Sequence, residues 1–119
     1  MMQHIHFIGI GGAGLSAIAQ VLLDQGYIVS GSDRAASASF NTISAAGATT
    51  YLGHTPQNIK GADLIIQSSA IPEDNPEVVA ALASGIPVLK RAPFLSQLTR
   101  EKQTLAVAVE KRNATDPTN

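Results

Sequence analysis

A glycine-rich segment, Gly-Ile-Gly-Gly-Ala-Gly at residues 9–14, lies between a short apolar run and a stretch with helical spacing. The apolar run, residues 5–10, has the length and composition of a buried strand. After Gly14, apolar residues recur three and four positions apart until Gly26, which can end a helix. A strand, a glycine turn and a helix in this order open a βαβ unit that can hold a phosphate group. The sequence therefore predicts a nucleotide-binding α/β domain.

Each glycine of this loop has a physical reason. Gly9 permits a tight turn, while Gly11 and Gly12 leave no Cβ between the backbone and a phosphate oxygen. Gly14 lets the helix pack closely on the strand, and the free N–H groups at the helix start favour an anion. The alternative is a tight turn without a ligand, because glycines alone make such turns common. The strand–helix setting favours phosphate binding.

The rest of the chain continues the alternation of strands and helices. We expect strands at residues 27–30, 49–52, 63–67 and 87–89, and helices at residues 38–46 and between Asn75, as the cap, and Gly85. A short helix near residues 93–98 and an apolar, β-rich run at 104–109 follow. This pattern predicts an α/β, Rossmann-like, doubly wound parallel sheet of about five strands in a single domain, residues 1–108. Residues 109–119 are polar, and we expect them to form a disordered tail.

Composition narrows the classes of function. Hydrophobic residues make up 45% of the 119 and aromatic residues only 4%, so the core must be aliphatic. A net charge of -1 argues against a nucleic-acid partner. The absence of cysteine excludes disulfides and cysteine-based metal sites. With no long apolar run and no signal peptide, we expect a cytoplasmic protein without a membrane partner.

Candidate binding residues follow the predicted strands, so they should meet at the carboxyl edge of the sheet. Asp33 can accept hydrogen bonds from ribose hydroxyls, or it can serve only as a turn residue. Residues 68–72, Ser-Ser-Ala-Ile-Pro, can approach a ligand or form an ordinary strand exit. His54 lies in a loop near the same edge, and Lys90 and Arg91 could meet an anion or remain solvated.

Two further sequence patterns, for a metal site and for catalysis, give no support to either function. His4 and His6 alternate on the first strand and could share a face, but no third ligand is evident, so we expect no metal site. No catalytic set is recognisable: the Gly-x-Ser-x-Gly elbow and the Gly-x-x-x-x-Gly-Lys-[Ser/Thr] ATP loop are both missing from this sequence. We therefore expect a binding domain without catalytic residues.

Several segments in a fixed order resemble the N-terminal domain of the Mur ligase family. They are residues 6–16 (His-Phe-Ile-Gly-Ile-Gly-Gly-Ala-Gly-Leu-Ser), 31–33 (Gly-Ser-Asp), 53–54 (Gly-His), 68–72, 75–77 (Asn-Pro-Glu) and 86–91 (Ile-Pro-Val-Leu-Lys-Arg). The pattern is most similar to the ligases that add the first amino acid, L-alanine, to UDP-N-acetylmuramate in peptidoglycan synthesis. The ligases that recycle murein tripeptide share much of it. The resemblance covers residues 3–108.

The resemblance implies that UDP-N-acetylmuramate is the ligand. Its diphosphate would lie at Gly11, Gly12, Ala13 and Gly14. The uridine side would be held by Asp33 and residues 69–71, and the diphosphate or sugar by His54 and Arg91. The substrate-binding residues expected are thus Gly11, Gly12, Ala13, Gly14, Ser32, Asp33, His54, Ser69, Ala70, Ile71 and Arg91.

The sequence departs from the family pattern after residue 108. There the family continues into an ATP-binding Gly-Thr-His-Gly-Lys-Thr-Thr loop, whereas this chain reads Val-Glu-Lys-Arg-Asn and ends soon after. The full-length family enzyme would use ATP and Mg²⁺. We expect this chain to be truncated, to bind no cofactor and to be inactive alone, and it carries no signal for an oligomeric state. The alternative function is an NAD(P)-binding domain of an oxidoreductase or redox-sensing regulator, which the glycines and Asp33 would also suit.

Overall fold

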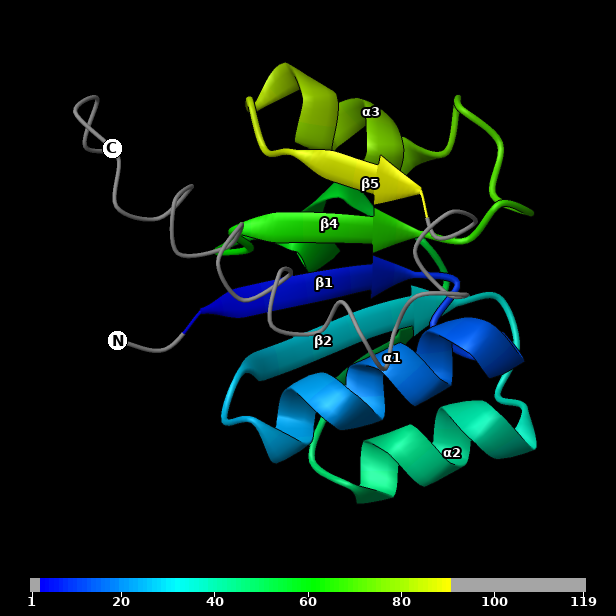
Figure 1. Cartoon of the computed structure of the whole chain (residues 1–119). Coiled ribbons are helices and arrows are strands. Elements are labelled where there is room, and N and C mark those ends of the chain that lie inside the picture. The colour runs from blue at the N-terminus through cyan, green and yellow to red at the C-terminus, as the bar shows by residue number, and fades with distance from the viewer. Residues whose placement is uncertain (1–2, 91–119) are drawn as a thin grey trace, which may run out of the picture.

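In the computed structural model, which describes residues 3–90, five short strands form one parallel sheet (Figure 1). The strand order is β3-β2-β1-β4-β5, and every neighbouring pair is parallel. The predicted α/β class with a parallel sheet of about five strands is therefore confirmed. The bounds of the strands are β1 His4–Ile8, β2 Ile28–Asp33, β3 Thr49–Leu52, β4 Leu64–Gln67 and β5 Val88–Lys90.

Helices cover both faces of this sheet, as in doubly wound folds. The helices α1 (Ala13–Asp24) and α2 (Ala38–Ala45) lie together on one face, and α3 (Pro76–Ala83) lies on the other, beside β4 and β5 (Figure 1). A 3₁₀ helix, η1 (Pro56–Ile59), packs next to α3. All strand arrows point the same way, so the loops that follow them share one edge (Figure 1).

Two apolar clusters sit on either side of the sheet because side chains alternate along each strand. Ile5 and Phe7 of β1 belong to the larger cluster, beneath α1 and α2. Ile8 points the other way, into the smaller cluster with Ile65 of β4 and Val78 of α3. Among the described residues no aromatic side chain other than Phe7 and Phe40 is in the buried core, so packing is aliphatic as composition predicts.

The first turn differs from the expectation that the strand would reach residue 10. β1 ends at Ile8 because Gly9 adopts a φ of 91°. The amides of Gly9 and Ile10 then both donate to the Ser32 carbonyl, at 2.8 and 3.0 Å. Ile10 is still fully buried, against Gly31, where an added Cβ would lie 2.3 Å from the Ile10 Cδ1 atom. The turn thus ties the glycine loop to β2.

The bounds of other strands and helices differ from the predicted ones by a few residues. β2 runs on to Asp33, which is therefore the last residue of a strand, and η1 was not predicted. The helix expected after Asn75 is confirmed: the Asn75 side chain accepts a hydrogen bond from the Glu77 amide at 2.8 Å. The predicted helix at 93–98, the strand at 104–109, the polar tail and Arg91 lie outside the described residues.

Within residues 3–90, the helices are too short and insufficiently apolar for any of them to cross a bilayer.

Candidate ligand site

A cavity of about 440 Å³ lies at the carboxyl ends of the strands, where ligands of open α/β sheets bind. Its volume is in the range of small-molecule sites. Five of the residues predicted from sequence line it, namely Gly12, Asp33, His54, Ala70 and Ile71. The remaining lining residues are Gly9, Arg34, Ser68, Pro72 and Asn75.

The start of α1 faces this cavity with its backbone donors uncapped. Gly12 is the N-cap residue and makes no side-chain cap hydrogen bond. The amides of Gly11 and Gly12 are already engaged, because Gly11 donates to Asp33 at 2.9 Å and Gly12 donates to the Gly9 carbonyl at 3.0 Å. The N–H groups of the first helical turn have no intrahelical acceptor. These groups, beginning at Ala13 and Gly14, are the donors that a phosphate could meet.

Asp33 organises the loop as well as lining the cavity. One carboxylate oxygen accepts from the Gly11 amide at 2.9 Å, and the other accepts from the Arg34 amide at 2.8 Å. A Cβ on Gly11 would lie 2.8 Å from the Asp33 Oδ2 atom. A side chain at Gly11 would therefore crowd the Asp33 carboxylate and also the Ser37 Oγ atom, which lies 2.8 Å from the same Cβ position.

The segment after β4 forms a compact turn at the cavity wall. The Ser68 side chain accepts from the Ala70 amide at 3.2 Å, and the Ile71 amide donates to the Ser68 carbonyl at 3.0 Å. The Gln67 side chain donates to the Ile71 carbonyl at 3.3 Å. Ser69 is exposed at the tip of this turn and does not line the cavity.

A buried polar network lies under α3, on the sheet face opposite α1. Its centre is Glu77, whose side chain is fully buried and 3.4 Å from the Nδ1 atom of His54. Burial raises the pKa of the Glu77 carboxyl, but hydrogen bonds from its neighbours outweigh burial and hold that pKa below its ordinary value. The carboxylate accepts from His6 Nε2 and Ser32 Oγ, both at 2.7 Å, from Asn58 Nδ2 at 2.8 Å and from the Thr55 amide at 3.2 Å.

The network continues to the opposite end of β1. The Ser30 hydroxyl lies 2.7 Å from His6 Nδ1 and 2.7 Å from His4 Nε2. Burial lowers the pKa of His4 below its ordinary value, against a hydrogen bond to the backbone of Gly61 that raises it. His4 and His6 therefore do share a face, as expected. Within the described residues, no group of three or more potential ligands is placed to hold a metal ion.

The structure does not bring every predicted residue to the cavity. Ser32 is fully buried and turned toward Glu77, so it touches the site only through His54, 2.9 Å from its hydroxyl. Lys90 forms an ion pair with Glu73. Sequence reasoning missed Glu77 as part of the site, because a glutamate in the first turn of a helix is fully explained by the helix dipole.

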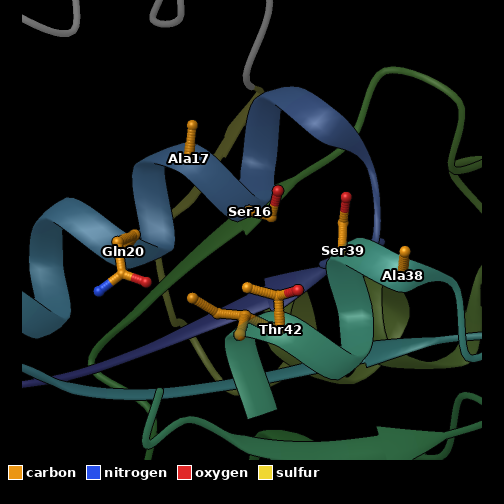
Figure 2. Close-up of a pocket in the computed structure, with 7 residues that line it drawn as sticks. Ser16, Ala17, Gln20, Ala38, Ser39 and Thr42 are labelled. Carbon is orange, nitrogen blue, oxygen red and sulfur yellow. The ribbon is translucent and has the colours of Figure 1, made fainter. Parts of the chain in front are cut away.

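A second groove, of about 270 Å³, lies between α1 and α2 (Figure 2). Figure 2 shows small and hydroxyl side chains along both helices. The lining includes no charged residue and none of the glycine loop; it consists of Ser16, Ala17, Gln20, Ala38, Ser39, Thr42 and Ile43. The cavity at the strand ends is lined by charged residues and by residues of the glycine loop, so it is the better candidate for the ligand site.

This fold and cavity define a Rossmann-like α/β domain whose ligand site lies at a glycine loop and the start of the first helix. Residues 4–103 match the model of the "Mur ligase family, catalytic domain". The chain belongs to the Mur ligase family.

Individual relatives agree with this assignment. The UDP-N-acetylmuramate–L-alanine ligase of Laribacter hongkongensis is 52% identical over 107 residues, which are 90% of this chain and 23% of that protein. The crystal structure of the UDP-N-acetylmuramate–alanine ligase from Thermotoga maritima matches with a TM-score of 0.77 and 34% identity, over 86% of this chain and 24% of that one. The UDP-N-acetylmuramate:L-alanyl-gamma-D-glutamyl-meso-diaminopimelate ligase of Neisseria meningitides matches with a TM-score of 0.69 and 28% identity, over 76% and 29%. This chain thus spans about a quarter of the length of these relatives.

Proposed function

We propose that this domain binds UDP-N-acetylmuramate, as the substrate domain of the ATP-dependent ligase that adds L-alanine to it in cytoplasmic peptidoglycan synthesis. The diphosphate would lie against the first turn of α1. The uridine and the sugar would lie along Asp33, His54 and the turn at residues 69–71, and Arg91, which lies outside the described residues, remains a candidate for contact with the diphosphate or the sugar.

The observation that carries this proposal is that the uncapped start of α1 faces a cavity. An arginine and a histidine side chain also line that cavity. Gly12 leaves the helix amides without a side-chain acceptor, while Arg34 and His54 line the same space. Backbone donors, the helix dipole and a guanidinium together favour a doubly charged diphosphate. A nucleotide sugar, which carries a diphosphate, therefore suits these donors and positive charges better than an uncharged ligand does.

Titration calorimetry on the 119-residue chain tests the proposal directly. We expect saturable 1:1 binding of UDP-N-acetylmuramate, weaker binding of UDP, and no binding of NADH. NADH is the discriminating ligand, because an NAD(P)-binding domain is the alternative for a glycine loop followed by an acidic strand end. Binding of NADH without UDP-N-acetylmuramate would overturn the proposal in favour of that alternative.

The chemistry of ligation requires groups that this sequence does not contain. The full-length enzyme would use ATP and Mg²⁺, and the Gly-Lys-Thr phosphate loop that would hold them is missing from residues 1–119. We therefore expect the purified chain to bind its substrate but to release no phosphate from ATP in the presence of UDP-N-acetylmuramate and alanine. ATP- and alanine-dependent phosphate release above the background of a heat-inactivated sample would contradict this.

A further inference from the structure

Glu77 is a fully buried carboxylate that does not line the cavity yet reaches it through one neighbour. Its two oxygens accept hydrogen bonds from His6, Ser32, Asn58 and the amide of Thr55. With four donors around it, the carboxylate is held ionised, because each of these bonds favours the charged form. An ionised carboxylate can only accept hydrogen bonds.

The positions of the hydrogens follow from that restriction. Ser32 has one hydroxyl hydrogen, and it is donated to Glu77 Oε1 at 2.7 Å. The Ser32 oxygen must then accept from His54 Nδ1, which lies 2.9 Å away. Nδ1 also faces Glu77 Oε2 at 3.4 Å. Both contacts require the proton of a neutral His54 to be on Nδ1.

The other ring nitrogen is consequently left for the ligand. His54 lines the cavity, and its two side-chain polar contacts within residues 3–90, to Ser32 and Glu77, are both made through Nδ1. In a neutral imidazole with the proton on Nδ1, Nε2 is an acceptor. It can receive a hydrogen bond from a hydroxyl or N–H group of a bound nucleotide sugar.

We propose that Glu77 is a positioning residue for the ligand site: by facing His54 Nδ1 directly and by bonding to it through Ser32, it fixes the orientation and the Nδ1–H tautomer of His54 and thereby presents a bare Nε2 to the ligand. This inference rests on the proposed function for the identity of the ligand. The link between Glu77 and His54 does not depend on any ligand.

Glu77→Gln is the informative substitution, because it keeps the volume and changes only the hydrogens. The new NH2 group must lie either at the Oε1 position, beside Ser32 and His6, or at the Oε2 position, beside Asn58 and the Thr55 backbone. The Thr55 N–H cannot reverse its direction, whereas the Ser32 hydroxyl can rotate and a neutral His6 can carry its proton on Nδ1, toward Ser30, instead of on Nε2. The amide therefore donates to Ser32 and to His6 Nε2, the Ser32 hydrogen turns to His54 Nδ1, and the His54 proton moves to Nε2.

Two other substitutions in the same network separate positioning from mere loosening. Asn58→Ala removes the bonds from Asn58 to Glu77 at 2.8 Å and to the Gly53 carbonyl at 3.2 Å, but leaves the Ser32–His54 contact in place. Ser32→Ala removes the hydroxyl and leaves Glu77 Oε2 next to Nδ1. Both should destabilise the fold, and both should keep the proton on Nδ1.

The first measurement is the tautomer of His54 in the ligand-free chain, read from long-range ¹H–¹⁵N correlations of the two ring nitrogens. The pH is set to about 8.5, where imidazoles are ordinarily neutral. We expect Nδ1–H in the wild type, in Asn58→Ala and in Ser32→Ala, and Nε2–H or a mixture in Glu77→Gln. Nε2–H in the wild type, or an unchanged tautomer in a folded Glu77→Gln protein, would overturn the proposal. A shift in Asn58→Ala would do the same.

The second measurement is affinity for UDP-N-acetylmuramate by calorimetry at the same pH. Loss of one well-placed hydrogen bond predicts binding roughly tenfold weaker in Glu77→Gln and within about twofold of the wild type in Asn58→Ala. Equal affinity in Glu77→Gln, with the tautomer moved, would overturn the role in ligand binding.

If the wild type binds no UDP-N-acetylmuramate, the proposed function fails while the tautomer result still decides the Glu77–His54 link. If Glu77→Gln does not fold, Ser32→Ala decides the link: with the hydroxyl gone, Nδ1–H supports the direct hold of Glu77 Oε2 on Nδ1, and Nε2–H overturns it.

Discussion

At the scale of the single residue, Asp33 shows how one carboxylate can serve the loop and the ligand together. Both of its oxygens accept backbone amides, from Gly11 and Arg34, and the same side chain lines the cavity. A carboxylate oxygen has further lone pairs, so a ribose hydroxyl could still be accepted. Its first effect, however, is to hold the glycine loop against β2.

Asp33→Asn should therefore weaken both stability and binding. The amide nitrogen cannot accept from a backbone N–H, so one of the two bonds is lost, at a cost of about 1 kcal/mol of unfolding free energy. We expect affinity for UDP-N-acetylmuramate to fall about tenfold, because the loop is then free to shift. Urea unfolding and calorimetry measure the two effects.

Asp63→Ala is the matched control for that prediction, because it also removes one hydrogen bond from a carboxylate to a backbone amide. Asp63 also accepts a backbone amide, that of His4 at 2.9 Å, but at the opposite end of the sheet. It should cost similar stability with no change in affinity. Equal losses of affinity in the two variants would mean that general loosening, rather than the loop, controls binding.

At the scale of the element, the start of α1 differs from the starts of α2 and α3. The Ser37 side chain caps α2 and the Asn75 side chain caps α3, whereas Gly12 leaves α1 uncapped. Gly12 has a φ of −66° and a ψ of 142°, which any residue can adopt and which N-cap residues typically show. Backbone geometry alone therefore does not require glycine there, and the open amides are better explained by a ligand.

Gly12→Asn and Gly12→Asp should each trade binding for stability. A side-chain cap on α1 gains a few tenths of a kcal/mol over glycine, so the unfolding midpoint should rise slightly. The cap also occupies an amide that the diphosphate needs, so affinity should fall about tenfold for Asn and further for Asp, whose charge repels the ligand. Since we expect both variants to be at least as stable as the wild type, unfolding would not account for a loss of affinity. Wild-type affinity in both would move the phosphate away from this helix.

At the scale of the whole molecule, the parts of the fold that follow from local pattern were predictable. Strands and helices alternate, and glycines mark their ends, so the parallel sheet and its carboxyl-end site could be inferred from residues a few positions apart. The network around Glu77 could not. Its partners His6 and Ser32 are 71 and 45 residues away in the chain, and only the packing of α3 on the sheet brings them together. Ser32 points into the protein rather than toward the cavity for the same reason, because its hydroxyl bonds to Glu77 of α3.

That buried network also gives the whole molecule a pH dependence of stability. The folded pKa of His4 lies below its ordinary value of about 6.5 because of burial, so below that pH the unfolded chain takes up a proton that the folded chain refuses. The folded pKa of Glu77 lies below about 4.5, so the stability it contributes is present above that pH and is lost as the pH falls through the folded value. Both groups therefore lower stability in acid.

We expect the urea midpoint of the 119-residue chain to fall in two stages on acidification, the first beginning near pH 6.5 and the second below about pH 4.5. His4→Gln should lose less stability than the wild type between neutral pH and about pH 5.5, because glutamine has no proton to take up. Asp63→Asn, which changes a neighbour of His4 without removing the imidazole, should keep most of the first stage. Parallel curves for the wild type and His4→Gln would contradict the assignment of the first stage to His4.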